Sequence, residues 1–161
     1  MVDLSRRRLF TRKTASEDTL RLPWLNTPKF FTDLCTQCGE CLKACETQII
    51  VKGDGGFPQV DFTIDECTFC YQCADACPEP LFLSKQEAPW QAKASINEQC
   101  LAQRNVECRS CSEMCESVAI QFQLEVGRVA QPKLDTQLCN GCGACVSVCP
   151  TLSINVSNFV V

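Results

Sequence analysis

The 161-residue sequence contains no histidine. This absence excludes zinc sites that mix cysteine with histidine, Rieske centres and haem bound through histidine, and most imidazole-based acid–base catalysis. The sequence also has no apolar run near the ~18 residues that a membrane span requires. No apolar core follows the charged N-terminal residues, so we expect neither a secretory signal peptide nor a membrane-spanning helix.

What the sequence has in abundance is cysteine: sixteen residues, about a tenth of the chain. A content this high indicates either a disulfide scaffold or a metal protein. Because no signal peptide is expected, we predict that the thiols stay reduced and available to metal.

The charge is unevenly distributed. The formal net charge is −4. Residues 1–13 hold five basic side chains and one acidic one, so they carry +4 and the remainder carries −8. An acidic body repels nucleic acid, and we expect no nucleic-acid partner.

The most informative stretch is residues 139–150, which follow the pattern C-x2-C-x2-C-x3-C-P. Bacterial ferredoxins hold a [4Fe–4S] cluster with this spacing. Each thiolate has to reach a different corner of a small cube, and a tight loop with a sulfur at every third residue can reach three corners. Gly141 and Gly143 let the backbone approach the cluster. In two-cluster ferredoxins the last cysteine of each run binds the other cluster.

The rest of the chain repeats this stretch. Runs at residues 35–45 and 67–77 recur at residues 108–115 and 139–149, with offsets of 70 and 72 residues between matching cysteines. A duplication of a two-run unit therefore accounts for the whole cysteine pattern.

The third run departs from the rule. Its first cysteine, Cys100, lies before Cys108 at a C-x7-C spacing, and an enlarged loop is needed if Cys100 is a ligand. Glu46 and Glu116 stand where proline would follow the first and third runs. A carboxylate there disfavours an added electron, so we expect a lower reduction potential or easier cluster loss near these residues.

Each copy reads run, hairpin, run, strand, which is the order in a two-cluster ferredoxin. We therefore predict an α+β fold of two tandem bacterial-type 2[4Fe–4S] ferredoxin modules with short hairpins and short helices, plus an irregular N-terminal arm. The predicted strands are residues 49–51 with 57–62, 81–83, 118–122 with 129–134, and 152–156. The predicted domains are a basic arm at 1–29, the first module at 30–85, a linker at 86–95 and the second module at 96–161.

The N-terminal arm has two parts. Residues 5–10 resemble a twin-arginine export motif, but a polar stretch follows them at 11–18. The alternatives are a solvated basic tail, a docking arm for a partner or membrane surface, and an export signal. Residues 21–25, with Phe30 and Phe31, are apolar; we expect them to pack across the cluster domain, and contact with a partner is the alternative.

The exchange of last cysteines between runs predicts four [4Fe–4S] clusters. The predicted ligand sets are Cys35, Cys38, Cys41 and Cys77 for the first site; Cys67, Cys70, Cys73 and Cys45 for the second; Cys100, Cys108, Cys111 and Cys149 for the third; and Cys139, Cys142, Cys145 and Cys115 for the fourth. The alternatives are zinc, disulfides and free core thiols, although a four-cysteine zinc site favours two separated C-x2-C knuckles. The alternative for Cys100 is a buried inert thiol, which leaves a three-iron or labile third site.

Four such clusters would add about −8 to the formal charge. Modules of this size have few large apolar residues, so we expect the iron–thiolate bonds to hold each fold together and metal loss to unfold it. A [4Fe–4S] cluster with four thiolate ligands has no open coordination position, so we predict one-electron transfer and no enzyme activity. A purely structural role for the clusters is the alternative.

Four features together resemble the NapF family. They are the basic start without a signal core, the Arg21-Leu22-Pro23-Trp24 segment, the Cys-Glu endings of the first and third runs, and the Cys-Leu-Ala-x5-Cys-x2-Cys-x3-Cys pattern from Cys100. The four-cysteine runs alone occur in many ferredoxins, so the third run and the arm carry the resemblance.

The resemblance implies an accessory polyferredoxin of the periplasmic nitrate reductase system, located in the cytoplasm. Its implied partner is the precursor form of the catalytic nitrate reductase subunit, NapA, and its implied role is to assist maturation of that subunit before export. Two alternatives stay open: a general electron-transfer subunit of another oxidoreductase complex, and a chaperone whose clusters only shape a docking face.

Overall fold

The computed structural model describes residues 20–26 and 31–158, and its helices and strands are all short. In chain order they are α1 (Phe31–Leu34), α2 (Glu40–Ala44), β1 (Ile50–Lys52), the 3-10 helix η3 (Asp54–Gly56), β2 (Pro58–Val60), α3 (Gln72–Asp75), β3 (Ala92–Ile96), α4 (Ser110–Glu113), β4 (Ile120–Gln123), β5 (Gln131–Leu134), α5 (Ala144–Ser147) and β6 (Ile154–Asn158). The predicted α+β class is confirmed. The predictions for the basic tail, the export-like motif and Phe30 fall outside the described residues.

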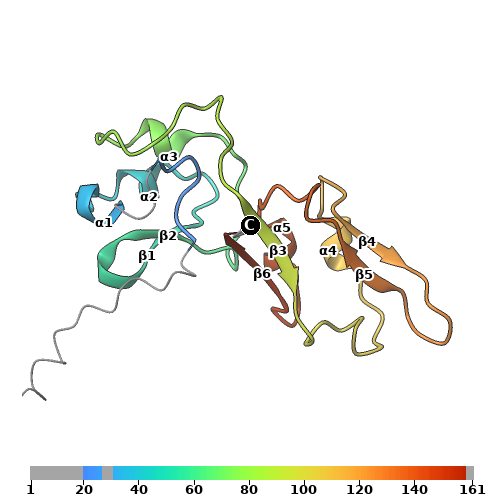
Figure 1. Ribbon diagram of the computed structural model, residues 1–161. Helices are drawn as coiled ribbons and strands as arrows, with labels where there is room; N and C mark the ends of the chain where they lie inside the picture. The colour runs from blue at the N-terminus through green and yellow to red at the C-terminus, as the bar shows by residue number, and fades with distance from the viewer. Residues whose placement is uncertain (1–19, 27–30, 159–161) are drawn as a thin grey trace, which may run out of the picture.

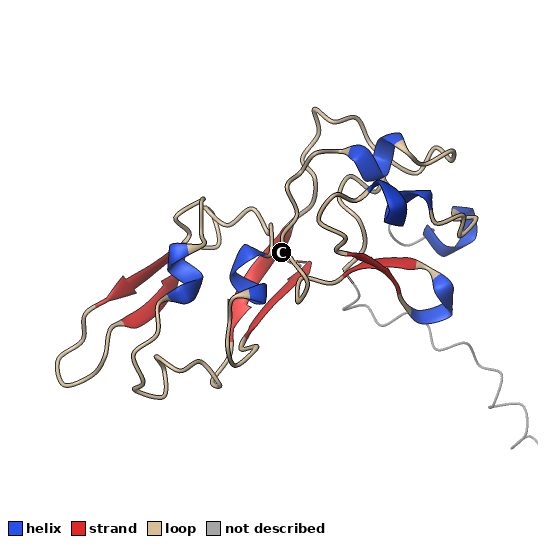
Figure 2. Ribbon diagram, turned by 180° about the vertical axis from the view of Figure 1, so that it is seen from behind, coloured by secondary structure: helices blue, strands red, loops and turns tan. Residues whose placement is uncertain are grey.

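The elements form two lobes that lie side by side (Figure 1). The first lobe contains α1 to α3 with β1 and β2, and the second contains α4, α5 and β3 to β6. Viewed from behind, the strands form three separate pairs rather than one continuous sheet (Figure 2). None of the helices in the described parts of the chain has the length and apolar character that a membrane span requires.

All three strand pairs are antiparallel. β1 pairs with β2, with Ile50 opposite Val60. β4 pairs with β5, with Ile120 opposite Leu134. Both hairpins predicted from the sequence are therefore confirmed. The third pair joins β3 to β6, the two ends of the second lobe, and so confirms the strand predicted at residues 152–156.

The strand predicted at residues 81–83 is wrong. Phe82 forms only an isolated bridge to Leu25, supported by the N–H of Leu83 donating to the carbonyl of Trp24 at 2.7 Å. Pro23 offers no N–H, and Trp24 adopts a left-handed φ of 60°. These two residues interrupt the extended backbone, so the pairing between the arm and residues 81–83 stops at one bridge. The pairing of β3 with β6, by contrast, continues for five residues.

The apolar part of the arm packs onto the first lobe, as predicted. Leu22 and Trp24 are only 3% and 4% exposed, and Phe31 is 2% exposed. Trp24 lies edge-on against Phe69 and Tyr71, with ring centroids 6.2 and 5.1 Å away. The segment therefore covers the second cysteine run of the first lobe.

The two lobes share one hydrophobic core. It contains Leu22, Ile50 and Phe62 from the first lobe together with Ala94 and Val146 from the second. The stretch predicted as a linker, 86–95, contains the start of β3 at Ala92. Trp90, in the same stretch, lies edge-on to Phe62, with ring centroids 6.0 Å apart.

Candidate metal centres

The sixteen cysteines line four cavities, four cysteines to each. The cavities are lined by Cys35, Cys38, Cys41 and Cys77; by Cys45, Cys67, Cys70 and Cys73; by Cys100, Cys108, Cys111 and Cys149; and by Cys115, Cys139, Cys142 and Cys145. In every cavity three cysteines come from one run and the fourth is the last cysteine of its partner run. The structure thus brings together the same four sets that the exchange of last cysteines predicts.

In the first, second and fourth runs the backbone turns sharply between the second and third cysteines, whereas Arg109 of the third run has a φ of −136°. Gly39, Tyr71 and Gly143 occupy equivalent positions there, with φ values of 78°, 75° and 86°, and each begins a helix of four or five residues. This reversal wraps the loop around the cavity and directs the flanking sulfurs to one space. Tyr71 shows that the left-handed conformation does not demand glycine at this position.

The cavities suit a cluster better than a single ion or a disulfide. Within residues 20–26 and 31–158, no three Cys, Asp or Glu side chains come together closely enough to hold one metal ion. All sixteen cysteines lie in these ranges, and none forms a disulfide. Four thiols around one cavity match a cube whose corners each bind one sulfur.

The metal-free thiols resist ionisation. Burial raises the pKa of Cys41, Cys67 and Cys111 to about 11 and that of Cys73 and Cys145 to about 12. Repulsion from neighbouring thiolates is the second contribution that raises these pKa values. Positively charged iron offsets both effects because it binds the deprotonated form.

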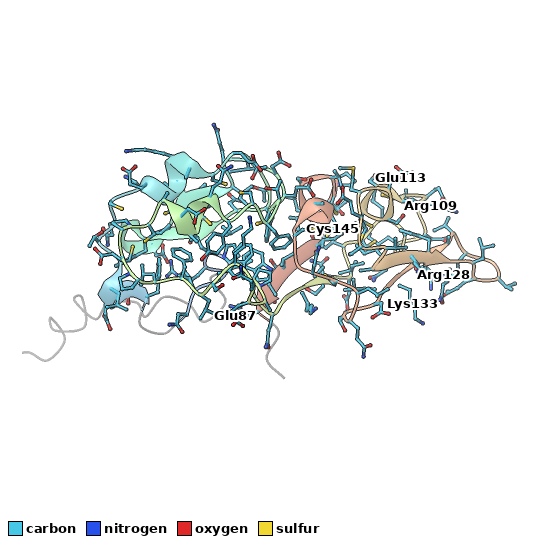
Figure 3. The ribbon with its side chains drawn as sticks, turned by 90° about the horizontal axis from the view of Figure 1, so that it is seen from above. Glu87, Arg109, Glu113, Arg128, Lys133 and Cys145 are labelled. Carbon is cyan, nitrogen blue, oxygen red and sulfur yellow. The ribbon has the colours of Figure 1, made fainter. Side chains whose placement is uncertain are left out.

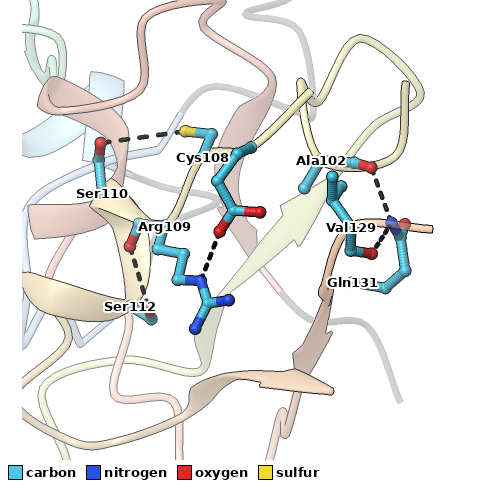
Figure 4. Close-up of polar contacts among 8 residues, drawn as sticks. Ala102, Cys108, Arg109, Ser110, Ser112, Val129 and Gln131 are labelled. Carbon is cyan, nitrogen blue, oxygen red and sulfur yellow. Dashed lines mark hydrogen bonds and ion pairs between the residues drawn. The ribbon is translucent and has the colours of Figure 1, made fainter. Parts of the chain in front are cut away.

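The enlarged loop between Cys100 and Cys108 is held in place by the hairpin that follows it. The Gln131 side-chain amide on β5 donates to the carbonyl of Ala102 at 2.8 Å (Figure 4). The N–H of Val129 donates to Oδ1 of Asn105 at 3.0 Å. Ala102 is fully buried. These contacts fold the seven intervening residues against the hairpin and return Cys100 to the third cavity, where it is 8% exposed.

Several cysteine sulfurs accept hydrogen bonds from donors that were not predicted from the sequence. The N–H of Ala94 donates to Cys139 Sγ at 3.4 Å. The N–H of Ser153 donates to Cys149 Sγ at 3.3 Å, and its hydroxyl lies 3.2 Å from the same sulfur. Burial raises the pKa of Cys149, but the hydrogen bonds from Ser153 and Thr151 outweigh it, and the net pKa is lowered.

A repeated C-x-[ST] signal could have revealed some of these contacts. The last cysteine of the first, third and fourth runs has a hydroxyl two residues later. Thr47, Ser117 and Thr151 lie 3.6, 3.5 and 3.7 Å from the respective sulfurs. The second run has Glu79 at this position and lacks the hydroxyl.

The second and fourth cavities lie where the two lobes meet. The N–H of Cys67 donates to the carbonyl of Cys142 at 2.8 Å, and the indole N–H of Trp90 donates to the carbonyl of Asn140 at 3.1 Å. Seen from above, Cys145 lies near the middle of the elongated molecule, whereas Arg128 and Lys133 lie toward the far end of the second lobe (Figure 3).

Comparison with known proteins supports the cluster assignment. Residues 34–80 and 106–152 each match the 4Fe-4S dicluster domain family. Two matches to a two-cluster domain give four [4Fe–4S] clusters for the chain. The matches cover both runs of each lobe, apart from Cys100.

Curated relatives match over nearly the whole chain. The chain is 48% identical to the ferredoxin-type protein NapF of Haemophilus influenzae over 87% of its length and 80% of the relative's. It is 44% identical to the ferredoxin-type protein NapF of Escherichia coli K12 over 95% of its length and 94% of the relative's. A weaker relative, which is one subunit of the ion-translocating oxidoreductase complex of Methanosarcina acetivorans, is 30% identical over 76% of this chain and 46% of its own length.

Proposed function

The chain belongs to the family of ferredoxin-type NapF proteins, iron–sulfur proteins of electron transfer, and from this we propose that it assists maturation of the nitrate reductase catalytic subunit, NapA, in the cytoplasm before that subunit is exported. The observation that carries the electron-transfer part is the set of four cavities, each lined by four thiols from two runs. When bound there, a [4Fe–4S] cluster accepts and releases one electron.

We assign the ligands as the cavities group them. Cys35, Cys38, Cys41 and Cys77 bind the first cluster; Cys45, Cys67, Cys70 and Cys73 the second; Cys100, Cys108, Cys111 and Cys149 the third; and Cys115, Cys139, Cys142 and Cys145 the fourth. With four thiolates each, none of these sites keeps a position open for substrate, so the protein is a carrier and not an enzyme. The proposed domains are the arm at 1–29, modules at 30–85 and 96–161, and the linker at 86–95, whose last residues from Ala92 onward pair with β6 of the second lobe.

The charge distribution supports docking to a partner protein. The body carries −8 and the first thirteen residues +4, and four oxidised clusters would add about −8 more. Such a body favours a neutral or basic partner surface at moderate salt.

Affinity capture tests this role. The cluster-loaded full chain should retain the NapA precursor from cytoplasmic extract, and retention should weaken as salt rises. Deletion of the basic residues 1–13, which keeps the buried Leu22 and Trp24 in place, should reduce retention if the arm contributes to docking. Unchanged retention would contradict docking through the arm but would leave the partner assignment intact. Failure of the loaded full chain to retain the precursor would contradict the maturation role.

A second candidate is a general electron-transfer subunit of another oxidoreductase complex. The 30% identity to a component of an ion-translocating oxidoreductase complex favours it. This role predicts repeated reduction and oxidation of the clusters with that enzyme. The Cys142→Ser variant, where it still folds, distinguishes both of these roles from that of a chaperone. If the protein transfers electrons, the variant should lose its function. If the protein is a chaperone whose clusters only shape a surface, the variant should keep its function.

A further inference from the structure

The contact between Cys67 and Cys142 joins two different cluster sites. Cys67 belongs to the second cavity and Cys142 to the fourth, and the hydrogen bond between their backbones is 2.8 Å long. Among the backbone hydrogen bonds of the described residues, it is the one that links a cysteine of the first lobe to a cysteine of the second. Each of the four cavities is lined by residues of a single lobe, so this hydrogen bond links cavities that belong to different lobes.

Close packing fixes this contact. Gly143 follows Cys142, and a Cβ added there would overlap the ring of Phe62 from the first lobe. Phe62 is 7% exposed and lies edge-on to Trp90. Trp90 in turn lies edge-on to Phe69, with centroids 5.9 Å apart, and hydrogen-bonds to Asn140. The loops of the two cluster sites are thus joined through both backbone and aromatic contacts.

Within each lobe the two cavities are also neighbours. Helices α2 and α3 pack together, as do α4 and α5. Each of these helices carries one cysteine of its site: Cys41 on α2, Cys73 on α3, Cys111 on α4 and Cys145 on α5. The packed helices therefore bring the two sites of each lobe next to each other.

We propose that the Cys67–Cys142 contact is the crossing point for electrons between the lobes, so that the four sites form a relay in the order first, second, fourth, third. This order differs from the order of the runs in the sequence. It rests on the proposed electron-transfer function. Electron tunnelling weakens steeply with distance, and the backbone hydrogen bond between Cys67 and Cys142 directly connects the linings of the two inner cavities. The first and third sites then face external donors and acceptors at the two ends.

The crossing step is balanced as a one-electron exchange. A cluster held by Cys45, Cys67, Cys70 and Cys73 would give up one electron, and a cluster held by Cys115, Cys139, Cys142 and Cys145 would take it up. No bond forms or breaks, and no proton is required. The electron itself enters from an external one-electron reductant, for which Ti(III) citrate serves in the test.

The test uses Gly143→Ala in the full, cluster-loaded chain, with Gly39→Ala as its matched control. Both residues have positive φ at equivalent positions, so backbone strain is similar. Only the Gly143 methyl meets Phe62; nothing lies within 4 Å of a Cβ at Gly39. After full reduction, EPR spectroscopy measures magnetic coupling between clusters. We expect the wild type and Gly39→Ala to show coupling among four centres, and Gly143→Ala to lose the coupling between lobes and give two independent pairs.

Iron and sulfide content separates the possible failures. Chains without clusters would contradict the proposed function itself. In chains that hold about sixteen irons, three results would contradict the relay but not the proposed function. They are wild-type spectra that fit two independent pairs of clusters, wild-type coupling in Gly143→Ala, and an equal loss of coupling in Gly39→Ala.

If Gly143→Ala loses iron, Phe62→Ala replaces it, because Phe62 lines neither the second nor the fourth cavity. Its control is Phe57→Ala, which removes an edge-on contact with Phe31 inside the first lobe. Weaker coupling in Phe62→Ala alone supports the crossing point. Equal coupling in both variants overturns it.

Discussion

The hydroxyl of Ser153 lies 3.2 Å from the Sγ of Cys149, and the Ser153 N–H donates to the same sulfur at 3.3 Å. Ser153 is 1% exposed, so water cannot readily replace either donor. Hydrogen bonds to cluster sulfurs stabilise the more negative, reduced state and so raise the reduction potential. The third cluster should therefore depend on this serine.

Ser153→Ala removes the hydroxyl and keeps the N–H. We expect the potential of the third cluster to fall by about 40 mV, because a net hydrogen bond contributes about 1 kcal/mol and 1.4 kcal/mol corresponds to about 59 mV for one electron. EPR-monitored redox titration measures the change. Ser157→Ala, four residues later on β6, is the control and should leave all four potentials in place; an equal shift in both variants would refute the assignment.

Glu116→Gln removes a carboxylate that follows Cys115, a ligand of the fourth site. Two unit charges 4 Å apart interact by about 1 kcal/mol in water. Because Glu116 is exposed, we expect the fourth cluster's potential to rise by about 40 mV or less. Glu125→Gln, at the tip of the β4–β5 hairpin, makes the same charge change away from the cavities. The account of Glu46 and Glu116 fails if all clusters have indistinguishable potentials and stabilities.

Cys100→Ala tests the enlarged loop. If Cys100 is a ligand, the third site keeps three thiolates, and between about one and four of about sixteen irons should be lost. Iron analysis and the EPR spectrum of the oxidised protein, where a three-iron centre would be visible, measure the loss. Gln99→Ala is the neighbouring control. Full iron content with an unchanged spectrum in Cys100→Ala would mean that Cys100 is an inert core thiol.

Trp24→Ala should destabilise the first lobe. Trp24 is 4% exposed, contacts Phe69 and Tyr71, and donates its indole N–H to the carbonyl of Glu87 at 2.9 Å. Truncation of a buried tryptophan costs about 3–5 kcal/mol. We expect faster iron loss to a chelator from the first two sites. Leu124→Ala, where the side chain is 87% exposed, should not change the rate, and equal rates in both variants would contradict the packing role of Trp24.

The repeated spacing was sufficient to predict the fold class and the grouping of cysteines, because the cluster geometry dictates both. The strand predicted at residues 81–83 does not form, and the reason lies instead in one backbone angle. Trp24 combines a left-handed φ with packing against Phe69 and Tyr71 of the second run. The sequence pattern reveals neither the angle nor the packing. The pairing of β3 with β6 likewise joins segments about 60 residues apart.

The arrangement of the two lobes could not be predicted from the duplication. A repeat predicts two similar modules but not how they meet. Their meeting depends on Phe62 fitting against Gly143 and on Trp90 reaching Asn140. The loop after Cys100 is a similar case, because Gln131 holds it from 29 residues away.

The central claim is that the sixteen thiols bind four iron–sulfur cubes, and the content of iron and acid-labile sulfide in anaerobically prepared protein tests it most directly. Four cubes predict about sixteen of each per chain, with the visible and EPR spectra of [4Fe–4S] centres, and loss of the folded structure when a chelator removes the iron. Protein that is colourless and free of iron, yet folded, would contradict the account.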